Sequence, residues 1–573
     1  MRVNSINAAQ AYLSSVKREQ TNRNLNSSNQ IKYNNTFSAQ NITFGALPRR
    51  FDRVLLMILD GFGLKEGGRK NPFSKVYMPF YESLIKNHDG DTLFRPIEAS
   101  GTFVGLPPKL AGSSEVGHNN LGAGRMIPQD LMVIDEAIKD RSFRSVKPFL
   151  DAMQHVQDNN STLHLMTLLS DGYVHSSTAH LFELIKMAAS RGIKKEKLKV
   201  HAFLDGRDVA EGTAPLYIEK TNALLKECGF DSIASFIGMK YPMDRARAWD
   251  KTGVAYNLLV NGKAAHEAKT FEEIYERLHT FTTEKGKFLE KDMPPVKLAG
   301  FEPIKDGDSV IFTNYRNDRT RQLTDAITQS ECTAPFLEGQ KRLEDINFVC
   351  MTEYDPAYHL PIAFPAKVHS NTLTQTLNDQ KFYPWVAAET EKQAHVTFFF
   401  DGKKHIRFSD TSYYFPASDH EQLTPKMEAG ILKDLVLSWI GRPKSKAMIV
   451  NIANPDMIGH EANFEKARDM LELIDSRVLR QIINRTREED IATIITADHG
   501  NIEDLTHGGH TNNPVPFISV LPGLERAIES GKLFLDDAAD AAINRVAPSF
   551  LDALKGAKTP PVMYDSLFKM KDI

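Results

Sequence analysis

The chain has 573 residues, of which 41% are hydrophobic and 25% charged, and its formal net charge is −3. These values are ordinary for a globular protein and exclude a disordered, collagen-like or repeat protein. Because the length exceeds what one hydrophobic core normally serves, we expect two domains plus an additional segment. Lys and Arg are spread along the chain, which argues against a nucleic-acid partner.

The cysteines and the apolar runs bear on the cellular setting. Cys228, Cys332 and Cys350 lie far apart, with no pair at metal-binding or redox spacing. We therefore expect free thiols in a reducing compartment. The longest apolar run, at residues 54–59, is too short to cross a bilayer, so we expect no membrane partner.

The first fifty residues are rich in Asn, Ser and Gln, with seven basic residues and one acidic residue. We expect residues 1–50 to form a disordered polar leader outside the chemistry, because this composition cannot bury a core. An organelle-targeting peptide is the alternative, since such signals are basic and poor in acid. That alternative rests on one helical face shared by Ile6, Ala9, Leu13 and Val16. The Asn-rich part is unlike such signals, so the expected location is the cytoplasm.

From residue 52 on, short apolar runs alternate with polar turns and helical patterns, which predicts an α/β fold with mainly parallel sheets. The expected strands are 54–59, 163–169, 199–204, 233–237, 310–313, 346–351, 448–452 and 491–496. A helix is expected after Thr178, and Gly192 is placed to end it. Its buried face is expected to carry Leu181, Leu184, Ile185 and Ala188.

Carboxylates and imidazoles follow three of these strands directly. Asp60 follows the first, Asp456 and His460 follow 448–452, and Asp498 and His499 follow the last. Ligand sites in parallel sheets lie beyond the carboxyl ends of the strands. If these groups share a site, the chain between them must leave the sheet and return. We therefore predict a discontinuous domain of residues 51–128 and 366–560, an inserted α/β domain of residues 129–365 and a C-terminal tail of residues 561–573.

Asp456 and His460 are four residues apart, which puts both side chains on one face of a helix. Asn454 and Pro455 are the expected cap and first residue of that helix. An Asp and a His at this spacing are a weak motif alone, and a surface pair is the alternative interpretation.

The remaining candidates strengthen the prediction of a metal site. His510 lies in the rigid stretch HGGHTNNPVPFI, and Ser114 lies in a stretch dense with glycine that we expect to be a loop open to a phosphate group. Carboxylate and imidazole ligands suit Mn, Zn or Mg. Six such ligands and one hydroxyl are more than one ion can use, whereas two ions are a known solution for phosphoryl transfer.

Ten motifs carry a resemblance that spans about residue 52 to about residue 560. They are LMILDGFG, SSEVGHNNLGAGR, LSDGYVHSS, LDGRD, MDRARAW, YRNDRTRQ, AAETEKQAHVTFFF, NPDMIGH, TADHGN and HTNNPVPF. In this order they are similar to the cofactor-independent phosphoglycerate mutases, a branch of the alkaline phosphatase superfamily. The resemblance implies an alkaline-phosphatase-like metal domain interrupted by a substrate-binding domain.

The resemblance also implies an activity, the interconversion of 3-phosphoglycerate and 2-phosphoglycerate in glycolysis and gluconeogenesis through a phosphoserine on Ser114. It implies two divalent ions and no bisphosphoglycerate. Mn²⁺ is the first expectation, with Mg²⁺, Co²⁺ and Zn²⁺ as alternatives, and the chain is expected to be a monomer. One ion is expected at Asp60, Ser114, Asp498 and His499, and the other at Asp456, His460 and His510.

The resemblance places the substrate in the inserted domain and adds two catalytic positions. The expected substrate-binding residues are His175, Arg207, Asp208, Arg245, Arg316, Arg319 and Lys392. Arginine forks bind carboxylate and phosphate bidentately, although surface ion pairs are the alternative for these arginines. Asp208 is expected to act as a base toward a glycerate hydroxyl, and His175 and Lys392 to offset phosphate charge.

Some positions depart from the family pattern. Met239 stands where the family usually has Arg, and the neighbouring Lys240 is a candidate substitute for its charge. Tyr173 and Ser177 stand where Gly and His are more common. Two alternatives remain: a phosphopentomutase or metal-dependent phosphatase, which would lack the matched arginines, and a catalytically silent binding protein, which would have lost a metal ligand.

Overall fold

The computed structural model describes residues 47–571 except 69, 282–286, 341 and 419–422. The predicted leader, residues 1–50, lies outside the described residues apart from its last four. Within the described chain, no helix has the length and apolar content that a membrane span needs. All three cysteines are free, as expected.

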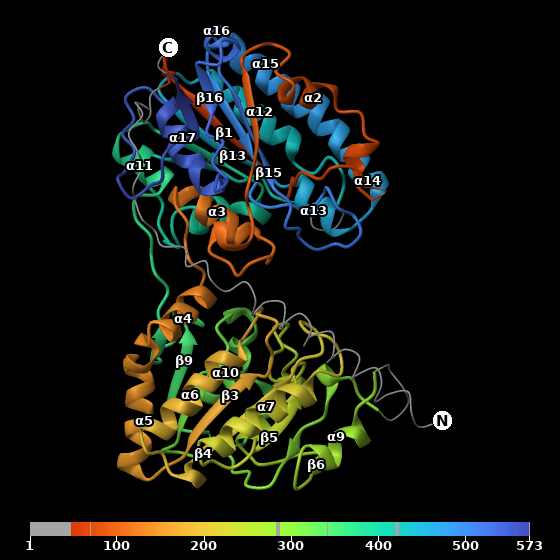
Figure 1. The fold of residues 1–573 in the computed structure, drawn as a ribbon, viewed down its shortest axis with the longest axis vertical. Coiled ribbons are helices and arrows are strands. Elements are labelled where there is room, and N and C mark those ends of the chain that lie inside the picture. Colours follow the sequence, from red (N-terminus) through yellow and green to blue (C-terminus); the bar gives the residue numbers. More distant parts are fainter. Residues whose placement is uncertain (1–46, 69, 282–286, 341, 419–422, 572–573) are drawn as a thin grey trace, which may run out of the picture. The chain divides into compact units, whose positions relative to one another are not determined.

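One sheet has seven strands in the order β12-β11-β13-β1-β14-β15-β2. Its strands are β1 (Val54–Leu59), β2 (Thr92–Ile97), β11 (Trp385–Ala387), β12 (Ser412–Tyr414), β13 (Ala447–Ile452), β14 (Ala492–Thr496) and β15 (Val515–Val520). Strand β1 runs parallel to both of its neighbours, β13 and β14, and Figure 1 shows this early strand beside late ones. All six residues of β1 are buried, because both faces of the central strand are covered.

Helices from the same parts of the chain pack around this sheet. They are α2 (Pro79–Ile85), α3 (Ser114–Ala123), α11 (Leu373–Asp379), α12 (Ala429–Ile440), α13 (Asn454–His460), α14 (Phe464–Leu473), α15 (Arg480–Glu488), α16 (Glu525–Glu529) and α17 (Val546–Ala553). Two π-helical segments, η9 (His395–Phe399) and η10 (Ile474–Leu479), interrupt the α-helical pattern. The predicted C-terminal tail contains β17 (Phe568–Met570), which pairs with β16 (Leu533–Leu535); that part of the tail is therefore a strand.

A second sheet has eight strands in the order β10-β9-β8-β3-β4-β5-β7-β6. They are β3 (Leu163–Leu168), β4 (Leu198–Leu204), β5 (Ser235–Gly238), β6 (His266–Glu267), β7 (Val296–Lys297), β8 (Ser309–Phe312), β9 (Asn347–Thr352) and β10 (Ile362–Phe364). The associated helices are α4 (Asp130–Lys139), α5 (Lys147–Asn159), α6 (Thr178–Ser190), α7 (Ala214–Glu227), α8 (Trp249–Leu259), α9 (Glu272–Leu278) and α10 (Arg321–Thr328).

The alternation of side chains along β3 divides the interior around this sheet into two cores. Leu163 and Leu165 belong to one cluster, whereas Met166 and Leu168 belong to another. Successive residues of a strand point to opposite faces, so helices must cover both faces of this sheet. This is why β3 has apolar residues on both of its faces and not on one alone.

The α/β fold with mainly parallel sheets is confirmed. All eight predicted strands are present, with ends within two residues of the predicted ones, and α6 forms after Ser177 as expected. The seven-stranded sheet takes its strands from residues 54–97 and 385–520, and the eight-stranded sheet from residues 163–364. The chain therefore leaves the first sheet and returns to it. The domain boundaries themselves stay a prediction.

Candidate functional site

The predicted metal ligands gather at the carboxyl ends of neighbouring parallel strands. Asp60 follows β1 directly, Asp498 and His499 lie just beyond β14, and Asp456 lies in α13 after β13. Lys392 follows β11, the strand beside β13. Because parallel strands end at one edge of a sheet, residues hundreds of positions apart in sequence meet in one place.

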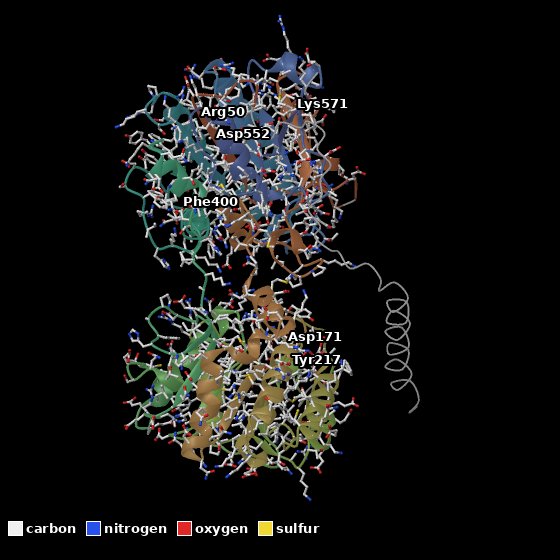
Figure 2. All side chains as sticks on the ribbon, turned by 60° about the vertical axis from the view of Figure 1, so that its left-hand side comes forward. Arg50, Asp171, Tyr217, Phe400, Asp552 and Lys571 are labelled. Carbon is white, nitrogen blue, oxygen red and sulfur yellow. The ribbon has the colours of Figure 1, made fainter. Side chains whose placement is uncertain are left out.

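Ser114 is the first residue of α3 and is almost fully buried. The glycine-dense stretch is therefore helical, and the expectation of a loop was wrong. Its glycines serve packing: a Cβ on Gly122 would lie 1.9 Å from the carbonyl oxygen of Phe400, a residue labelled in Figure 2. Since a helix N-terminus carries positive partial charge, it favours an anion near the Ser114 hydroxyl.

Lys392 contacts three residues of the cluster at once. Its buried ammonium donates to Asp60 Oδ1 at 2.7 Å, to Ser114 Oγ at 2.8 Å and to Asp456 Oδ2 at 2.6 Å. Burial works against the charged form, but the charges of Asp60, Asp456 and Asp498 outweigh it and raise the pKa of Lys392 above its usual value. The ammonium supplies the positive charge that these carboxylates require.

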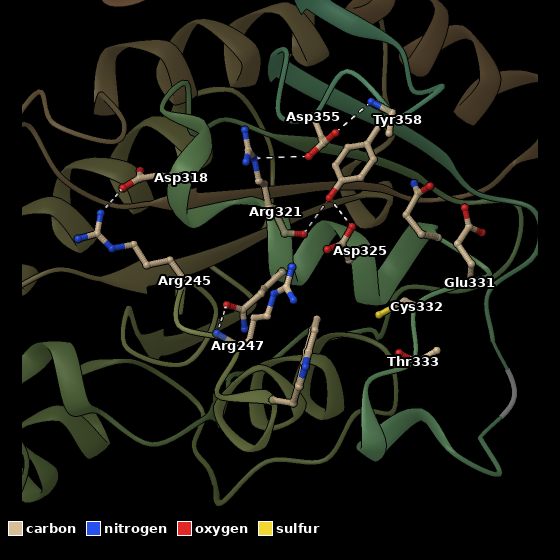
Figure 3. A pocket seen from close by; sticks show the side chains of 14 residues that line it. Arg245, Arg247, Asp318, Arg321, Asp325, Glu331, Cys332, Thr333, Asp355 and Tyr358 are labelled. Atoms are coloured by element: carbon tan, nitrogen blue, oxygen red, sulfur yellow. Dashed lines mark hydrogen bonds and ion pairs between the residues drawn. The ribbon is translucent and has the colours of Figure 1, made fainter. Parts of the chain in front are cut away.

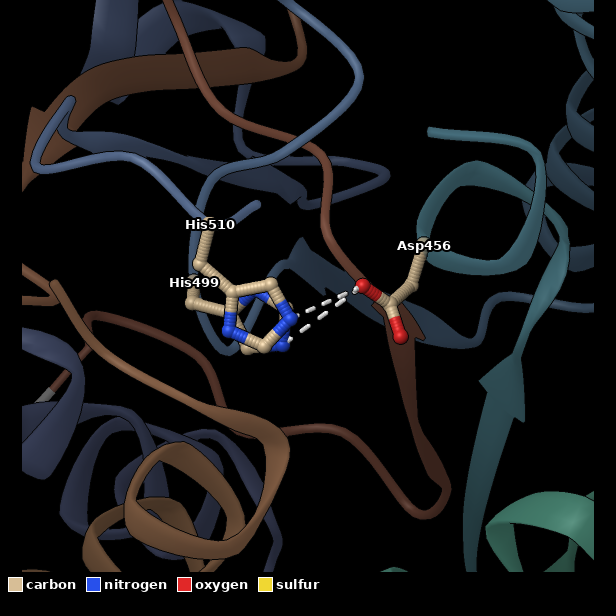
Figure 4. Close-up of side chains that lie close together, drawn as sticks. All are labelled: Asp456, His499 and His510. Carbon is tan, nitrogen blue, oxygen red and sulfur yellow. Dashed lines mark ion pairs between the residues drawn. The ribbon is translucent and has the colours of Figure 1, made fainter. Parts of the chain in front are cut away.

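Asp456 faces three imidazoles, and Figure 4 shows two of them, those of His499 and His510. Its Oδ1 lies 3.4 Å from Nε2 of both His460 and His510, and 4.0 Å from Nε2 of His499. Nδ1 of His460 and of His510 contacts the carbonyl oxygens of Gly508 and Gly112, at 2.7 and 2.9 Å. These backbone contacts hold the rings so that Nε2 points at the carboxylate.

Asp60 and Asp498 form the other side of the cluster. Asp498 Oδ1 accepts hydrogen bonds from the backbone N–H groups of Gly61 and His499, at 3.1 and 3.0 Å. Ser114 Oγ lies 3.3 Å from Asp60 Oδ1 and 3.0 Å from His499 Nε2. All seven predicted metal ligands thus lie in one connected cluster.

The donor chemistry fits divalent cations. Two sets of residues each offer ligand atoms within 4.8 Å of one another, Asp456 with His499 and His510, and Asp60 with His118 and Asp498. Among the described residues, the buried atoms Asp498 Oδ2 and His510 Nε2 have no hydrogen-bond partner. Carboxylate and imidazole atoms left in this way suit metal coordination.

The helix that carries Asp456 begins differently from the prediction. Ala453, not Asn454, is the residue before the first turn of α13. Asn454 instead donates from Nδ2 to the carbonyl oxygens of Pro425 and Lys426, at 2.9 and 3.0 Å. Its side chain ties the helix to a neighbouring loop, because the amide finds carbonyl acceptors there.

Lys392 is the one predicted substrate-binding residue that lies in the metal-ligand cluster. The predicted substrate residues of the inserted domain lie on loops that follow strands of the eight-stranded sheet. Asp318 connects them: it lies 2.7 Å from Arg245 Nη1, 3.1 Å from Arg316 Nε and 3.6 Å from His175 Nδ1. His175 Nε2 is 3.8 Å from Asp208 Oδ2. The hydroxyl of Tyr217 on α7 donates to Asp171 (Figure 2), which anchors the loop that carries His175.

Two pKa values in this cluster are strongly shifted. Burial and the nearby Asp205 raise the pKa of Asp208 to about 6, although arginines oppose the shift. Burial, with the charges of Arg316, Arg319 and Arg207, lowers the pKa of His175 to about 3. His175 is therefore neutral at physiological pH, while Asp208 is poised to exchange a proton.

A cavity of about 740 Å³ adjoins this cluster (Figure 3). Arg245 and Asp318 form one wall, and Arg321, Asp325 and Tyr358 line it further on. Both carboxylates and guanidinium groups line the cavity, which favours a polar, charged ligand over an apolar one.

The departures from the family pattern have structural explanations. Met239 is 3% exposed and belongs to a hydrophobic core. Lys240 pairs with Asp292 at 2.9 Å, so its charge already has a partner. Tyr173 has a φ of 57°, a conformation that favours glycine. Ser177 caps α6 by accepting a hydrogen bond from the N–H of Ala179.

Several residues of these clusters were not predicted from the sequence. His118 lies one helical turn after Ser114, so the spacing of the two residues was a usable signal. Asn451 lies inside the apolar strand β13, where a single polar residue is an anomaly. Asp318 lies within the YRNDRTRQ motif, between the two predicted arginines Arg316 and Arg319.

Comparison with known proteins shows which sequences the chain is similar to. The family model described as "BPG-independent PGAM N-terminus" matches residues 134–356. The 2,3-bisphosphoglycerate-independent phosphoglycerate mutase of Clostridioides difficile is 39% identical over 90% of this chain and 98% of its own. The Moorella thermoacetica enzyme of that name is 37% identical over 87% of this chain and 95% of its own.

A solved structure has the same fold. Leishmania mexicana phosphoglycerate mutase, crystallised at low cobalt concentration, superimposes with a TM-score of 0.67 and 26% identity. The match covers 92% of this chain and 100% of the other.

Proposed function

Since the chain belongs to the 2,3-bisphosphoglycerate-independent phosphoglycerate mutase family, we propose that it is an enzyme that interconverts 3-phosphoglycerate and 2-phosphoglycerate. The observation that carries the proposal is the placement of Ser114. Its hydroxyl lies at a helix N-terminus, within 3.0 Å of both Lys392 Nζ and His499 Nε2. A buried hydroxyl surrounded by cationic and metal-binding groups is suited to attack a phosphate ester.

We propose two divalent ions as cofactors, most simply Mn²⁺. Asp60, Ser114, Asp498 and His499 would hold one, and Asp456, His460 and His510 the other. When bound, such ions lower the proton affinity of a coordinated hydroxyl and offset the charge of phosphoryl oxygens.

The first half of the proposed reaction forms a bond between Ser114 Oγ and the phosphorus of 3-phosphoglycerate. The bond from phosphorus to the glycerate O3 breaks, and the serine proton passes to O3, so a phosphoserine and free glycerate result. Lys392 donates hydrogen bonds to the phosphoryl oxygens as their charge redistributes. The neutral imidazole of His175 serves as a hydrogen-bond donor and not as a charge.

The second half returns the phosphoryl group to the neighbouring oxygen. Asp208 takes the proton of the glycerate 2-hydroxyl, whose oxygen attacks the phosphorus. The bond to Ser114 Oγ breaks, and the proton returns to that oxygen. Arg245, Arg316 and Arg319 bind the glycerate carboxylate and the phosphate, because guanidinium forks match both anions.

Water must stay away from the phosphoserine, since its hydrolysis would make the enzyme a phosphatase. We propose that the inserted domain, residues 129–365, closes over the metal-binding domain, residues 51–128 and 366–560, and traps the glycerate. We also propose that the chain acts as a monomer in the cytoplasm, where free cysteines persist.

The test is an assay that couples the conversion of 3-phosphoglycerate to enolase, with Mn²⁺ and after treatment with a chelator. Activity should vanish in Ser114→Ala and survive in the control Ser113→Ala, which removes only the cap of α3. Incubation with ³²P-labelled substrate should label the wild type and not Ser114→Ala. Activity that survives the loss of the Ser114 hydroxyl contradicts the proposal, and phosphate release as fast as isomerisation indicates a phosphatase.

A further inference from the structure

His118 lies at the centre of the metal-ligand cluster without belonging to the predicted ligand set. It is fully buried on α3, one turn after Ser114, and its ring is near both carboxylates of one candidate metal set. Nδ1 lies 2.9 Å from the backbone oxygen of Ser114 and 3.1 Å from Asp498 Oδ2. Nε2 lies 2.9 Å from Asn451 Nδ2. Both ring nitrogens therefore have partners within the protein.

The partners determine where the ring carries its proton. Asn451 Nδ2 also donates to Asp60 Oδ2 at 2.7 Å. Rotating the side-chain amide of Asn451 by half a turn would place its oxygen against the Asp60 carboxylate, and the two would repel each other. The amide nitrogen must therefore face Asp60. The amide has two N–H groups, one for Asp60 and one for His118. Nε2 of His118 is then an acceptor, and the proton of the neutral ring is on Nδ1.

This tautomer leaves His118 no lone pair for an ion. The Nδ1 proton is donated to the backbone oxygen of Ser114, with Asp498 Oδ2 3.1 Å from the same nitrogen, and the Nε2 lone pair accepts from Asn451. Burial supports the same assignment of the proton, because Asp60, His118 and Asn451 are each 0% exposed. An amide in such surroundings turns rarely, because it would leave buried polar groups unpaired.

We propose that His118 is a positioning residue that orients Asp60 through Asn451 and holds the first turn of α3 beside Asp498. The residue acts through its hydrogen bonds and does not coordinate an ion. The proposal rests on the proposed function only in that the cluster binds divalent ions. Groups of this kind typically change metal affinity by about 10–100-fold when they are removed.

A double-mutant cycle tests whether His118 acts through Asn451. Mn²⁺ affinity is measured from the EPR signal of free Mn²⁺, without substrate, for the wild type, His118→Asn, Asn451→Ala and the double variant. His118→Asn keeps a donor close to the backbone oxygen of Ser114 but has no acceptor that reaches Asn451. We expect each single change to weaken binding about 10–100-fold, and the double variant to be within about threefold of the weaker single variant.

His118→Gln is the conservative rescue, because its amide oxygen reaches the position of Nε2 and can accept from Asn451. Its Mn²⁺ affinity should return to within about threefold of the wild type. Thermal unfolding in chelator checks that each variant folds. Multiplying effects in the double variant would overturn the proposal, since independent losses are expected if His118 is itself a ligand. Unchanged affinity in His118→Asn would also overturn it.

A measurement on the unmutated chain does not depend on how the variants fold. Protein with ¹⁵N-labelled histidine is loaded with ¹¹³Cd²⁺ and examined by NMR. We expect His118 to keep a proton on Nδ1 and to show no ¹¹³Cd coupling, in contrast to His460 and His510. Coupling at His118 would overturn the proposal. Because neither experiment uses phosphoglycerate, a chain that binds both ions but does not isomerise would refute the proposed function alone.

Discussion

Lys392 Nζ donates a hydrogen bond to Ser114 Oγ at 2.8 Å across 278 positions of sequence. The same ammonium contacts Asp60 and Asp456, all of them buried. The proposed nucleophile is thus held by a cation that also balances two carboxylates. In this arrangement one side chain links stability, metal binding and phosphoryl transfer.

Lys392→Met should destabilise the metal-free protein by about 3–5 kcal/mol, because it leaves buried carboxylates without their cation. Urea unfolding in chelator measures the change, and Mn²⁺ should restore much of it by supplying positive charge. Lys381→Met is the matched control, since Lys381 pairs with Asp410 at the surface and should cost at most about 1 kcal/mol. Equal losses in the two variants would contradict the role given to Lys392.

The rate of isomerisation should fall in acid with the protonation of Asp208. Its pKa is raised to about 6, and a carboxyl is ionised only above its pKa. The base is therefore present above about pH 6 in the free enzyme, and kcat/KM should fall about tenfold per pH unit below it. Asp208→Asn should remove this fall on the acid side of the pH profile, called the acid limb below, and lower kcat by about 10²–10⁴-fold.

Asp205→Asn is the informative companion, because the negative charge of Asp205 helps to raise the pKa of Asp208. An amide at position 205 keeps an acceptor for the backbone N–H groups of Arg207 and Asp208. The acid limb should therefore move to lower pH. Mn²⁺ affinity is measured at the same pH values to exclude loss of the ions, and an unmoved limb would argue against Asp208 as the titrating group.

Arg245 and Lys240 should differ in their importance for substrate binding. Arg245→Gln removes a fork beside Asp318 and should raise KM about 10–100-fold, as expected for a lost hydrogen bond to a charged group. Lys240→Gln should change KM less than about twofold, because that ammonium is engaged by Asp292. Steady-state kinetics with 3-phosphoglycerate decides; a large effect at Lys240 would show that it replaces the arginine missing at Met239.

A buried histidine pair should make the stability of the chain sensitive to acid. His164 Nδ1 lies 2.9 Å from His201 Nε2, and Asp308 and Ser235 bind the two outer nitrogens. Burial lowers the pKa of His201 well below its usual value, and His164 lowers it further. The unfolded chain, with a histidine pKa of about 6.5, then binds more protons, so stability is lost as pH falls below about 6.5.

His201→Asn should flatten this loss by up to about 1.4 kcal/mol per pH unit, since one titrating group is removed. The free energy of unfolding in chelator is compared between about pH 7.5 and about pH 5.5. His359→Gln, at an exposed position, is the control and should keep the wild-type slope. An unchanged slope in His201→Asn would exclude the pair as the acid-sensitive element.

Short-range patterns in the sequence were enough to predict the eight central strands, because strands covered on both faces are rich in apolar residues on both. They were not enough for β2 and β15, which carry Pro96 and Pro516 and yet pair with these prolines opposite each other. Proline argues against a strand in a local pattern. Only the tertiary structure shows which strand lies beside each proline and which backbone groups there need a hydrogen-bond partner.

For the candidate site, the sequence by itself determined residue types and their order: carboxylates and imidazoles just beyond strands, and a serine followed by glycines. Tertiary structure alone decided which atoms meet. It placed Lys392 on Ser114, joined His118 to Asp60 through Asn451, and paired Lys240 with Asp292. The physical reason is range: hydrogen bonds and charge pairs act over a few ångströms in space, and only the packed sheet brings such distant residues within that reach.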